Sequence, residues 1–355
     1  MKEIKDIIQA YDQLDKKSIR LALATVIYVA GSSYRRTGAR MLVQDNGTYT
    51  GGISGGCLEG DALKKANYCL ARNKTELVRY DTTKEGEDEI GVGLGCNGII
   101  DVLLTPIDTA SPDNPVELLR SCINDRATHC LITIVSSDRE DLPAGKMFRF
   151  DRNNNLSEEL SADAIKALQS NKSVVKTYED FTAFIEIIPP ALRVVLFGYG
   201  YDVYPLLRLG KELGWEMCLS TNPLKAAPAM KSLASSFYPT GEAIPVDDYT
   251  AYVLMAHDYN TDKNNLSMAL HSNVPYIGML GPLKRRAKAL EELEEEGQKF
   301  SAGQLERLYN PVGLDIGATS PEEIALAILS EIRAHFSGKN GGFLRLKRGP
   351  IHQRE

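Results

Sequence analysis

The fold class that the sequence predicts is α/β, in two domains, and three observations lead to it. At 355 residues the chain is longer than a single hydrophobic core usually serves. The double proline Pro189-Pro190 is the best linker candidate, because the residue pattern changes after it. The apolar run Arg193–Phe197 is then followed by a glycine turn and a helical pattern. This order is typical of the start of a Rossmann-like parallel sheet. We expect an α/β domain at 1–190, a Rossmann-like domain at 191–338 and a basic, Gly-rich tail at 339–355.

The composition excludes several classes of protein. A formal net charge of −6 disfavours nonspecific binding to nucleic acid, and no apolar stretch is long enough to cross a bilayer. The first residues, Met1–Lys5, lead into an amphipathic helix and do not form a signal peptide. The six cysteines lack the spacing of a disulfide framework, as is usual in a reducing compartment. We therefore expect a cytoplasmic protein that contacts neither nucleic acid nor membrane.

Apolar periodicity predicts the elements of the first domain in chain order. The opening helix has one apolar face, made by Ile4, Ile7, Ile8, Tyr11 and Leu14. A near-continuous apolar run rich in β-formers follows and predicts a buried strand. By the same reasoning, helices are expected at 2–16, 57–72, 116–125 and 162–170. Strands are expected at 21–29, 41–43, 75–81, 98–104, 129–136, 145–150 and 184–188, with 111–188 forming a mixed α/β segment.

A glycine-rich run, Gly51–Gly60, leads to a cysteine at the expected start of a helix. Glycines let the backbone approach a ligand closely, here through Gly55 and Gly56 next to Cys57. A cysteine in the first turn of a helix faces the positive end of the helix dipole, which favours the reactive thiolate. The alternative is a tight turn around a small buried cysteine. Glu59 either moves a proton or caps the helix start.

A second glycine-rich run, Gly91–Gly98, contains Cys96 and leads into an expected strand. Two cysteines on two glycine-rich loops of one domain can converge on one ligand. Cys57 and Cys96 do not form a CxxC pair, and none of the five histidines lies near either loop in sequence. The pattern argues against a structural zinc site, and a shared ligand site is the hypothesis.

A third loop of interest, Gly31–Arg40, joins the first two expected strands. It contains Arg35, Arg36 and Arg40 together with several hydroxyl side chains. Guanidinium groups match phosphate oxygens in geometry, so the loop suits an anion. A solvated basic loop is the alternative.

The second domain opens with a degenerate dinucleotide-binding pattern. Gly198 and Gly200 match the phosphate-binding turn, but Val203 takes the place of the third small residue. The second strand, expected at 215–219, is followed by Thr221 where an acidic residue would hold a ribose. Without that carboxylate we expect NAD to bind weakly or not at all, with NADP or another nucleotide as an alternative. The remaining alternative is a Rossmann-type scaffold with altered nucleotide binding.

The rest of the second domain continues the alternation of strands and helices. A buried strand at 251–256 ends at His257 and Asp258, and ligands gather at the carboxyl ends of strands in such sheets. We therefore predict that both residues contact a ligand, with a structural histidine as the alternative. The other expected elements are a strand at 276–280, helices near 266–270 and 284–296, and a last helix opened by a capping box at Ser320–Glu323.

Together these loops resemble the XdhC/CoxI family, the maturation factors of molybdenum hydroxylases such as xanthine dehydrogenase and carbon monoxide dehydrogenase. The family carries a Gly-Ser-x-x-Arg-x-x-Gly-Ala-x-Met loop followed by Ser-Gly-Gly-Cys-Leu-Glu. This chain matches both at Gly31-Ser32, Arg35 or Arg36, Gly38-Ala39, Met41 and Ser54–Glu59. The later Gly-Leu-Gly-Cys-Gly-Gly element has Asn97 in place of one glycine, and the carboxyl half resembles the family through His257-Asp258 and Pro311–Ala318. The acidic residue usual after the second Rossmann strand is missing.

The resemblance implies a function. Members of the family bind molybdenum cofactor (molybdopterin), help it receive its terminal sulfur and deliver it to the apo-hydroxylase. For this chain it implies that Cys57 and Cys96 offer soft sulfur to the metal, with Glu59 assisting. It also implies that the arginines of the third loop hold the phosphate of the pterin. The implied partners are an apo-molybdenum hydroxylase of the xanthine dehydrogenase type and a cysteine desulfurase.

Two other functional classes stay open. One is an NAD(P)-dependent oxidoreductase that uses the Rossmann-like half, against which the degenerate glycine pattern counts. The other is a protein–protein adaptor whose glycine loops only shape a docking surface. We expect a cofactor-binding chaperone more than an independent enzyme, and we expect it to form a homodimer or another homo-oligomer.

Overall fold

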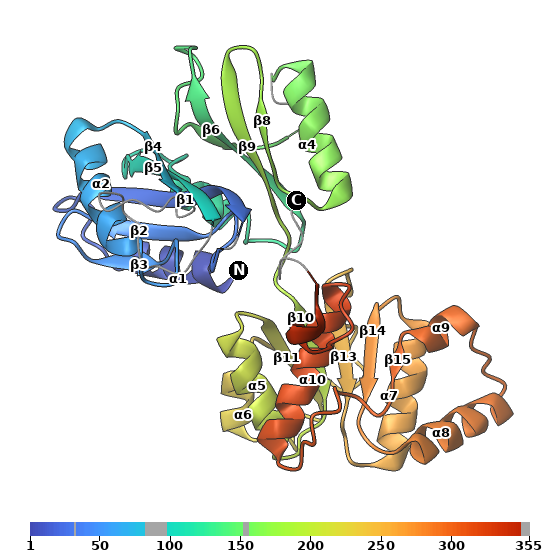
Figure 1. Cartoon of the computed structure of the whole chain (residues 1–355). Helices are drawn as coiled ribbons and strands as arrows, with labels where there is room; N and C mark the ends of the chain where they lie inside the picture. The colour runs from blue at the N-terminus through green and yellow to red at the C-terminus, as the bar shows by residue number, and fades with distance from the viewer. Residues whose placement is uncertain (32, 82–97, 152–155, 349–355) are drawn as a thin grey trace. The chain divides into compact units, whose positions relative to one another are not determined.

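The computed structural model describes residues 1–31, 33–81, 98–151 and 156–348. The chain divides into two compact units directly after Pro190 (Figure 1). Unit 1 is chiefly Glu3–Pro190 and unit 2 chiefly Ala191–Leu346. Each unit buries hydrophobic clusters of its own.

Unit 1 contains two antiparallel sheets in the described ranges. Its strands are β1 (Leu21–Gly31), β2 (Arg40–Gln44), β3 (Tyr49–Gly51), β4 (Glu76–Asp81), β5 (Gly98–Ile107), β6 (His129–Ser137), β7 (Met147–Arg149), β8 (Val174–Thr177) and β9 (Phe181–Ile188). Its helices are α1 (Lys2–Asp12), α2 (Glu59–Arg72), α3 (Pro115–Ser121) and α4 (Glu158–Ser170). The first sheet has the order β3-β2-β1-β5-β4, and the second sheet has the order β7-β6-β9-β8.

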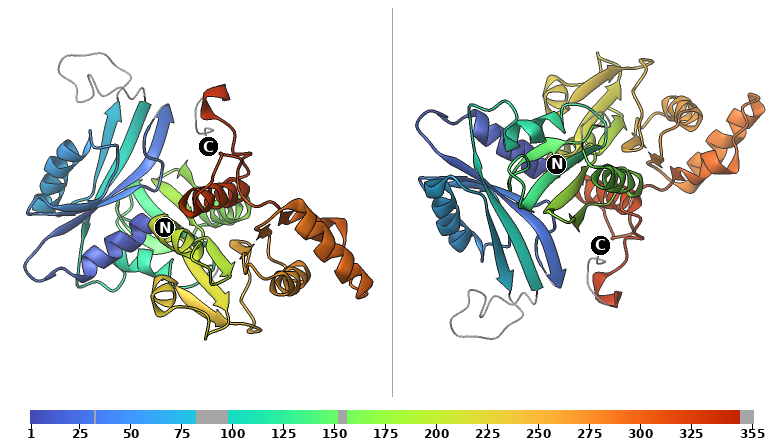
Figure 2. Two further views of the ribbon diagram at one scale, coloured as in Figure 1. Left: turned by 90° about the horizontal axis from the view of Figure 1, so that it is seen from below. Right: turned by 90° about the horizontal axis from the view of Figure 1, so that it is seen from above.

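Helices cover both faces of the first sheet. On one face α2 buries Ala62 and Cys69 against the inward side chains of β1 and β5. Both views in Figure 2 show α2 (blue) lying along that face. On the other face α1 buries the apolar stripe from Ile4 to Tyr11 that the sequence predicted, and this helix ends at Asp12. The first sheet is therefore a rigid support for the loops that leave its ends.

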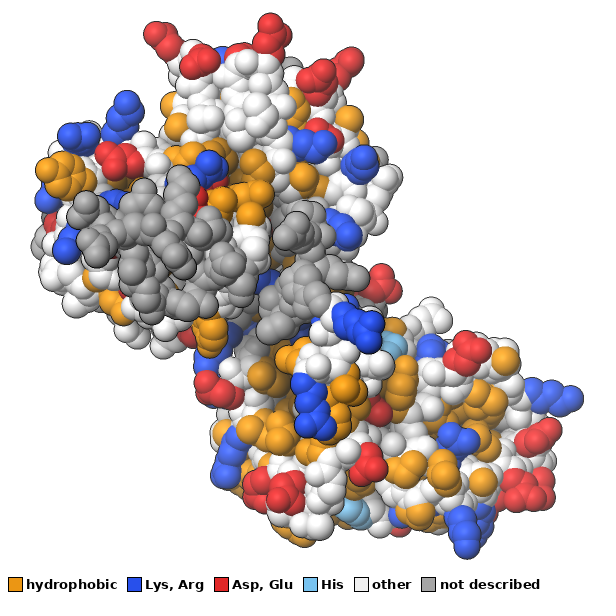
Figure 3. All heavy atoms as spheres, in the orientation of Figure 1, with side chains coloured by type: hydrophobic (Ala, Val, Ile, Leu, Met, Phe, Trp, Pro, Cys, Tyr) orange, Lys and Arg blue, Asp and Glu red, His pale blue; other side chains and the backbone are white. Residues whose placement is uncertain are grey.

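The second sheet packs on α4, which buries Leu160, Ala164 and Ala167 against β6 and β9. At the end of this sheet, where the β6–β7 and β8–β9 loops turn, acidic side chains gather on the surface (Figure 3). These loops carry Asp138, Glu140, Asp141, Glu179 and Asp180, together with Arg139. Arg139 lies 2.7 Å from Asp141 and 3.7 Å from Asp180, so this end of unit 1 is a solvated, mainly negative surface.

Unit 2 carries a parallel sheet. Its strands in the described residues are β10 (Arg193–Phe197), β11 (Glu216–Thr221), β12 (Ser236–Pro239), β13 (Thr250–Leu254), β14 (Tyr276–Met279) and β15 (Leu308–Tyr309). Every pairing is parallel, and the order β12-β11-β10-β13-β14-β15 is that of a Rossmann fold. The order reverses between β10 and β13, where such sheets bind ligands. The predicted Rossmann-like parallel sheet is confirmed.

Helices also cover both faces of the parallel sheet (Figure 1). The helices are α5 (Val203–Glu212), α6 (Pro228–Leu233), α7 (Tyr259–His271), α8 (Leu283–Glu295), α9 (Ala302–Glu306) and α10 (Pro321–Phe336), followed by a short 3₁₀ turn at Leu344–Leu346. One face packs on α5 and α10, and the other on α7 and α8. The expected capping box is present at the start of α10, where Ser320 accepts from the N–H of Glu323. No helix in the described part of the chain is both long and apolar enough to cross a membrane.

Several short elements, among them β3, β8 and β12, were not predicted from the sequence. Their residues are mostly half-exposed or exposed, so no apolar alternation marks them. They form because β2, β9 and β11 each offer a free backbone edge to which the neighbouring segment pairs.

Candidate functional site

Two of the loops that the sequence singled out meet at one end of the first sheet, and the third ends at Gly98 on the neighbouring strand. Gly31, where the arginine loop starts, is the register partner of Gly98, where β5 starts. Tyr34 of the arginine loop lies against Gly55 of the first glycine–cysteine loop, since a Cβ placed on Gly55 would lie 3.4 Å from Cγ of Tyr34. Cys96 and the rest of the second glycine–cysteine loop before Gly98 fall outside the described residues. Their expected approach to Cys57 stays a prediction.

Cys57 is exposed, and Gly55 and Gly56 beside it are exposed as well. The following helix α2 begins at Glu59 with Leu58 as its N-cap, and not at Cys57 as expected. The thiol therefore belongs to the loop and not to the first helical turn. The reason is that side chains of the loop, described next, hold its backbone N–H groups in a non-helical arrangement.

The carboxylate of Glu59 anchors this loop. Glu59 is only 5% exposed and accepts hydrogen bonds from the N–H groups of Ile53 (3.1 Å) and Ser54 (2.8 Å) and from the Ser54 hydroxyl. Burial by itself would raise the pKa of Glu59, but these hydrogen bonds outweigh it and hold the pKa below its usual value. The carboxylate therefore stays ionised at neutral pH, which favours anchoring of the helix start over proton transfer.

The hydroxyl of Ser54 continues the anchoring toward the cysteine. Ser54 Oγ accepts hydrogen bonds from the N–H groups of Gly56 and Leu58, each at 3.1 Å. The sulfur of Cys57 lies 3.6 Å from the same oxygen. Because the Ser54 proton is donated to Glu59, the Cys57 thiol is the donor in this contact. Sequence reasoning did not assign Ser54 to the site, although it stands directly before the glycine pair.

Cys57 differs from the other cysteines in the described part of the chain. Cys69, Cys122, Cys130 and Cys218 are all buried. Burial raises the pKa of the Cys69 and Cys130 thiols to about 12 and that of Cys122 to about 11. Within the described residues, Cys57 is therefore the thiol that a ligand in solvent can reach.

The arginine loop contains a deeply buried guanidinium. Arg40 is 1% exposed and forms a two-pronged ion pair with Glu186 of β9, in which Nη1 lies 3.0 Å from Oε1. Gly38 has a φ of +87°, and a Cβ there would lie 2.7 Å from Glu186 Oε1, so only glycine fits beside the pair. Arg40 thus joins the two sheets of unit 1. Its charge is already matched by Glu186, and we leave Arg40 out of the proposed phosphate site.

The other two arginines of the loop lie nearer the surface. Arg35 forms an ion pair with Glu3 of α1 and keeps about a third of its side chain exposed, at 32%. Glu3 also accepts from the backbone N–H of Arg40 at 2.7 Å, which ties α1 to the loop. Arg36 is exposed. Arg36, assisted by Arg35, is therefore the guanidinium that best fits the predicted anion contact.

In unit 2 the glycine turn after β10 lies beside the end of β13. A Cβ on Gly198 would clash with the carbonyl oxygen of Met255, so the two strand ends approach closely. A Cβ on Gly200 would come 2.5 Å from Oδ1 of Asp202. The other carboxylate oxygen of Asp202 lies 2.7 Å from Nε2 of His257. A carboxylate therefore occupies the start of α5, where the phosphates of a dinucleotide bind in such folds.

His257 follows β13 in an unusual backbone conformation. Its φ is +57°, a backbone angle that residues other than glycine rarely adopt. Residues with such angles cluster at functional sites. The conformation is held on both sides. The ring contacts Asp202, and the preceding N–H of Ala256 donates to the buried carboxylate of Asp262 at 2.9 Å. Asp262 in turn pairs with Arg285 of α8 at 2.5 Å. The His257 side chain is 55% exposed, so a ligand can reach it.

Two other predicted contacts of unit 2 have structural partners. Asp258 is the N-cap of α7 and accepts from the N–H of Thr261 at 2.8 Å and from its hydroxyl at 2.6 Å. These hydrogen bonds hold the pKa of Asp258 below its usual value. Thr221, the last residue of β11, is buried at 8% exposure. Asp258 is therefore occupied as a helix cap, and Thr221 presents little surface to a ligand.

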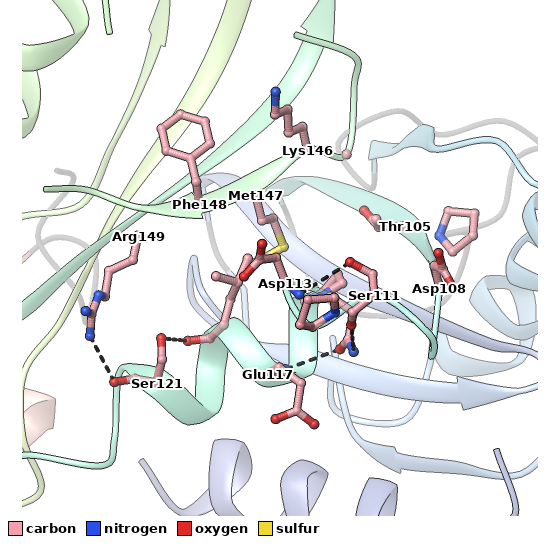
Figure 4. A pocket seen from close by; sticks show the side chains of 16 residues that line it. Thr105, Asp108, Ser111, Asp113, Glu117, Ser121, Lys146, Met147, Phe148 and Arg149 are labelled. Carbon is pink, nitrogen blue, oxygen red and sulfur yellow. Dashed lines mark hydrogen bonds between the residues drawn. The ribbon is translucent and has the colours of Figure 1, made fainter. Parts of the chain in front are cut away.

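A pocket of about 720 Å³ opens elsewhere in unit 1, between α3 and β7 (Figure 4). Arg149 of β7 points toward Ser121 and donates to its carbonyl oxygen at 3.3 Å. Asp113 and Glu117 line the side of α3. No residue that the sequence singled out lines this pocket. It is distinct from the loops described above.

The described side chains do not assemble a metal cage. Within the described ranges, no group of three or more His, Cys, Asp or Glu side chains is placed to hold a metal ion. The predicted metal contact of Cys57 with Cys96 extends outside these ranges, so it stays a prediction.

A Rossmann unit joined to a unit with a glycine–cysteine loop is the class of protein that the fold and the site define. Family models match both parts of the chain. The model described as the XdhC and CoxI family matches residues 15–81, and the model described as the XdhC Rossmann domain matches residues 194–332. The chain belongs to the XdhC and CoxI family.

Relatives support the same assignment over nearly the whole chain. A protein of Bacillus subtilis (strain 168), named as a probable xanthine dehydrogenase subunit, is 30% identical over 331 residues, which are 90% of this chain and 94% of the relative. The molybdenum cofactor insertion chaperone PaoD of Escherichia coli (strain K12) is 24% identical over 310 residues, 87% of this chain and 81% of the relative. A crystal structure described as a xanthine dehydrogenase from Bacillus halodurans aligns with a TM-score of 0.75 and 25% identity, over 96% of this chain and 97% of that one.

Proposed function

We propose that this protein is an accessory factor that binds molybdenum cofactor as its cargo and assists its insertion into a molybdenum hydroxylase of the xanthine dehydrogenase type. Membership of the XdhC and CoxI family supports this role, as does similarity to a chaperone named for molybdenum cofactor insertion. In this proposal the chain is a cofactor chaperone, not an independent enzyme. A cysteine desulfurase is the partner that supplies the terminal sulfur while the chain holds the cofactor.

The exposed thiol of Cys57 is the observation that carries the proposal. Molybdenum is thiophilic, and a soft thiol on a glycine-rich loop can approach it without steric hindrance. The loop is held in place by the buried Glu59 carboxylate and the Ser54 hydroxyl, so the sulfur is presented from a preorganised surface. Arg36 and Arg35 supply cations for the phosphate of the pterin.

The experiment is co-expression with a molybdenum hydroxylase operon, purification of the accessory chain, and analysis of bound molybdenum and pterin. We expect the wild type to retain both, and Cys57→Ala and Cys96→Ala each to retain less. Cys122→Ala serves as the matched control because this cysteine is buried away from the loops, and its folding is checked by thermal denaturation. Equal retention by the wild type and both loop variants, or no retention by the wild type, would contradict the proposal.

For unit 2 we propose a Rossmann scaffold that binds NAD weakly or not at all. The carboxylate of Asp202 at the start of α5 supports this, because it repels the phosphates that a glycine turn otherwise accepts. The burial of Thr221, which replaces the acid that holds a ribose, supports it further. His257 lies next to Gly200 and is 55% exposed, so it is the side chain of this turn that a ligand can reach.

A further inference from the structure

We propose that Tyr34 is a stacking platform that binds the planar pterin ring of the cargo. The inference rests on the function proposed above and names a residue that neither the sequence motifs nor the comparisons assign. It is carried by the exposure of Tyr34, by its contact with Gly55 and by its position between the thiol loop and the two surface arginines.

The first observation is the exposure of the ring. Tyr34 is 75% exposed, which among the described tyrosines is matched by Tyr201 at 75%, whereas Tyr28 and Tyr49 are exposed by less than half. A ring this exposed gains little free energy from packing, so burial does not explain its place. Exposed aromatic side chains are common on protein surfaces, so the neighbours of the ring decide what it does.

The second observation is the glycine beneath the ring. A Cβ on Gly55 would lie 3.4 Å from Cγ and 3.5 Å from Cδ1 of Tyr34, which is ordinary van der Waals contact. Gly55 does not have a positive φ, unlike its neighbour Gly56. The backbone at position 55 therefore accepts other residues, and a side chain that extends beyond Cβ would meet the ring of Tyr34. The ring of Tyr34 therefore lies next to the loop that carries Cys57.

The third observation is the chemistry on either side of the ring. Tyr34 is followed directly by Arg35 and Arg36, whose guanidinium groups suit a phosphate. On the other side it contacts the loop that presents the Cys57 thiol. Molybdenum cofactor carries a planar pterin ring system, a phosphate and a metal in one molecule. An aromatic face close to a cationic site and to the loop of a soft sulfur offers a contact to each of these parts, since planar heterocycles stack on tyrosine.

The test uses pterin itself as the probe, because stacking on tyrosine quenches its fluorescence. We expect titration of wild-type protein and of Tyr34→Phe to give the same affinity and quenching. Tyr34→Ala should bind about tenfold more weakly and lose the quenching. Tyr68→Ala is the matched control, because Tyr68 is 64% exposed on α2 of the same unit. Equal binding by Tyr34→Ala and the wild type, or no pterin binding by the wild type, overturns the proposal.

A second variant tests the platform without removing it. Gly55→Leu should push the ring aside and weaken pterin binding as Tyr34→Ala does, whereas Gly60→Leu should not, since nothing lies within 4 Å of a Cβ at Gly60. Measuring molybdenum retention in parallel separates the two proposals. Full retention by Tyr34→Ala overturns the stacking platform and leaves the insertion function standing. The opposite outcome is also informative. If Tyr34→Ala loses pterin binding but even the wild type retains no molybdenum, the result supports the platform and contradicts the insertion function.

Discussion

Each unit has a glycine-rich loop before a helix, and in each unit a carboxylate of the protein itself lies at the start of that helix. In unit 1 the carboxylate is Glu59, which is 5% exposed and bound by the backbone of its own loop. In unit 2 it is Asp202, which contacts the ring of His257, a side chain that is 55% exposed. The comparison teaches that a glycine loop before a helix creates a favourable place for negative charge, and that the chain itself can supply that charge.

The two carboxylates are both largely buried, at 5% exposure for Glu59 and 13% for the Asp202 side chain, and they differ in their partners. Glu59 is an anchor, because removing it leaves buried N–H groups without acceptors. Asp202 instead contacts His257, whose side chain is open to solvent. Arg40 of unit 1 resembles Glu59 in this respect, because its buried charge is paired within the protein, with Glu186. We therefore expect substitution of Glu59 or of the Arg40–Glu186 pair to change stability, and substitution of Asp202 to change binding.

The largest effect is expected at the Arg40–Glu186 pair. Glu186→Ala leaves a guanidinium that is 1% exposed without its partner, and breaking such a pair costs about 3–5 kcal/mol in the free energy of unfolding. Urea denaturation followed by circular dichroism measures it. The double variant Arg40→Met/Glu186→Leu is the control and should recover most of the loss, since an apolar replacement removes the buried charge. A loss below about 1 kcal/mol for Glu186→Ala would show that this pair behaves like a surface ion pair.

The next largest effect is expected at Glu59. Glu59→Ala leaves the N–H groups of Ile53 and Ser54 without their acceptor, and we expect a loss of about 2–4 kcal/mol. Asp202→Ala, measured in the same way, should cost less than about 1 kcal/mol because its partner is exposed. Similar losses for the two variants would remove the distinction between a carboxylate held by buried N–H groups and one whose partner is exposed.

The pH dependence sharpens the same distinction. The pKa of Glu59 in the folded chain lies below the unfolded value of 4.5. Its ionised form therefore contributes its full stabilisation above pH 4.5, and the contribution is lost as the pH falls from 4.5 toward the lower folded-state pKa. Glu59→Gln cannot titrate, so the difference in unfolding free energy between wild type and variant should shrink as the solution is acidified. A constant difference between pH 7 and pH 3 would refute the assignment.

The smallest effect is expected at Asp202. Asp202→Asn keeps the shape of the side chain and removes its negative charge, so a bound diphosphate should gain about 1 kcal/mol, roughly fivefold in affinity. Calorimetric titration with NAD and NADP measures this, with Asp258→Asn as a control for the loss of a nearby charge. Micromolar binding of NAD by the wild type would show that neither Asp202 nor Thr221 prevents binding, and the oxidoreductase alternative would then lead.

The sequence predicted some elements closely and missed others in both units. The run Arg193–Phe197 matched β10 residue for residue, and the capping box at Ser320 fixed the start of α10. Both signals are local, because a buried parallel strand is apolar throughout and a helix cap depends on residues a turn apart. In unit 1 the strands β3 and β8 carried no such pattern, since they exist through their neighbours.

The site divides in the same way. The glycine runs, the exposed cysteine loop and the arginine loop were evident from the sequence because each is continuous in the chain. The partners that set their roles were not: Glu186 lies far along the chain from Arg40, and Asp202 meets His257 only when β10 and β13 pair. Sequence by itself therefore determined which residues are available for chemistry. The tertiary structure decided which of them already have a partner within the protein, because burial and charge pairing depend on segments that only folding brings together.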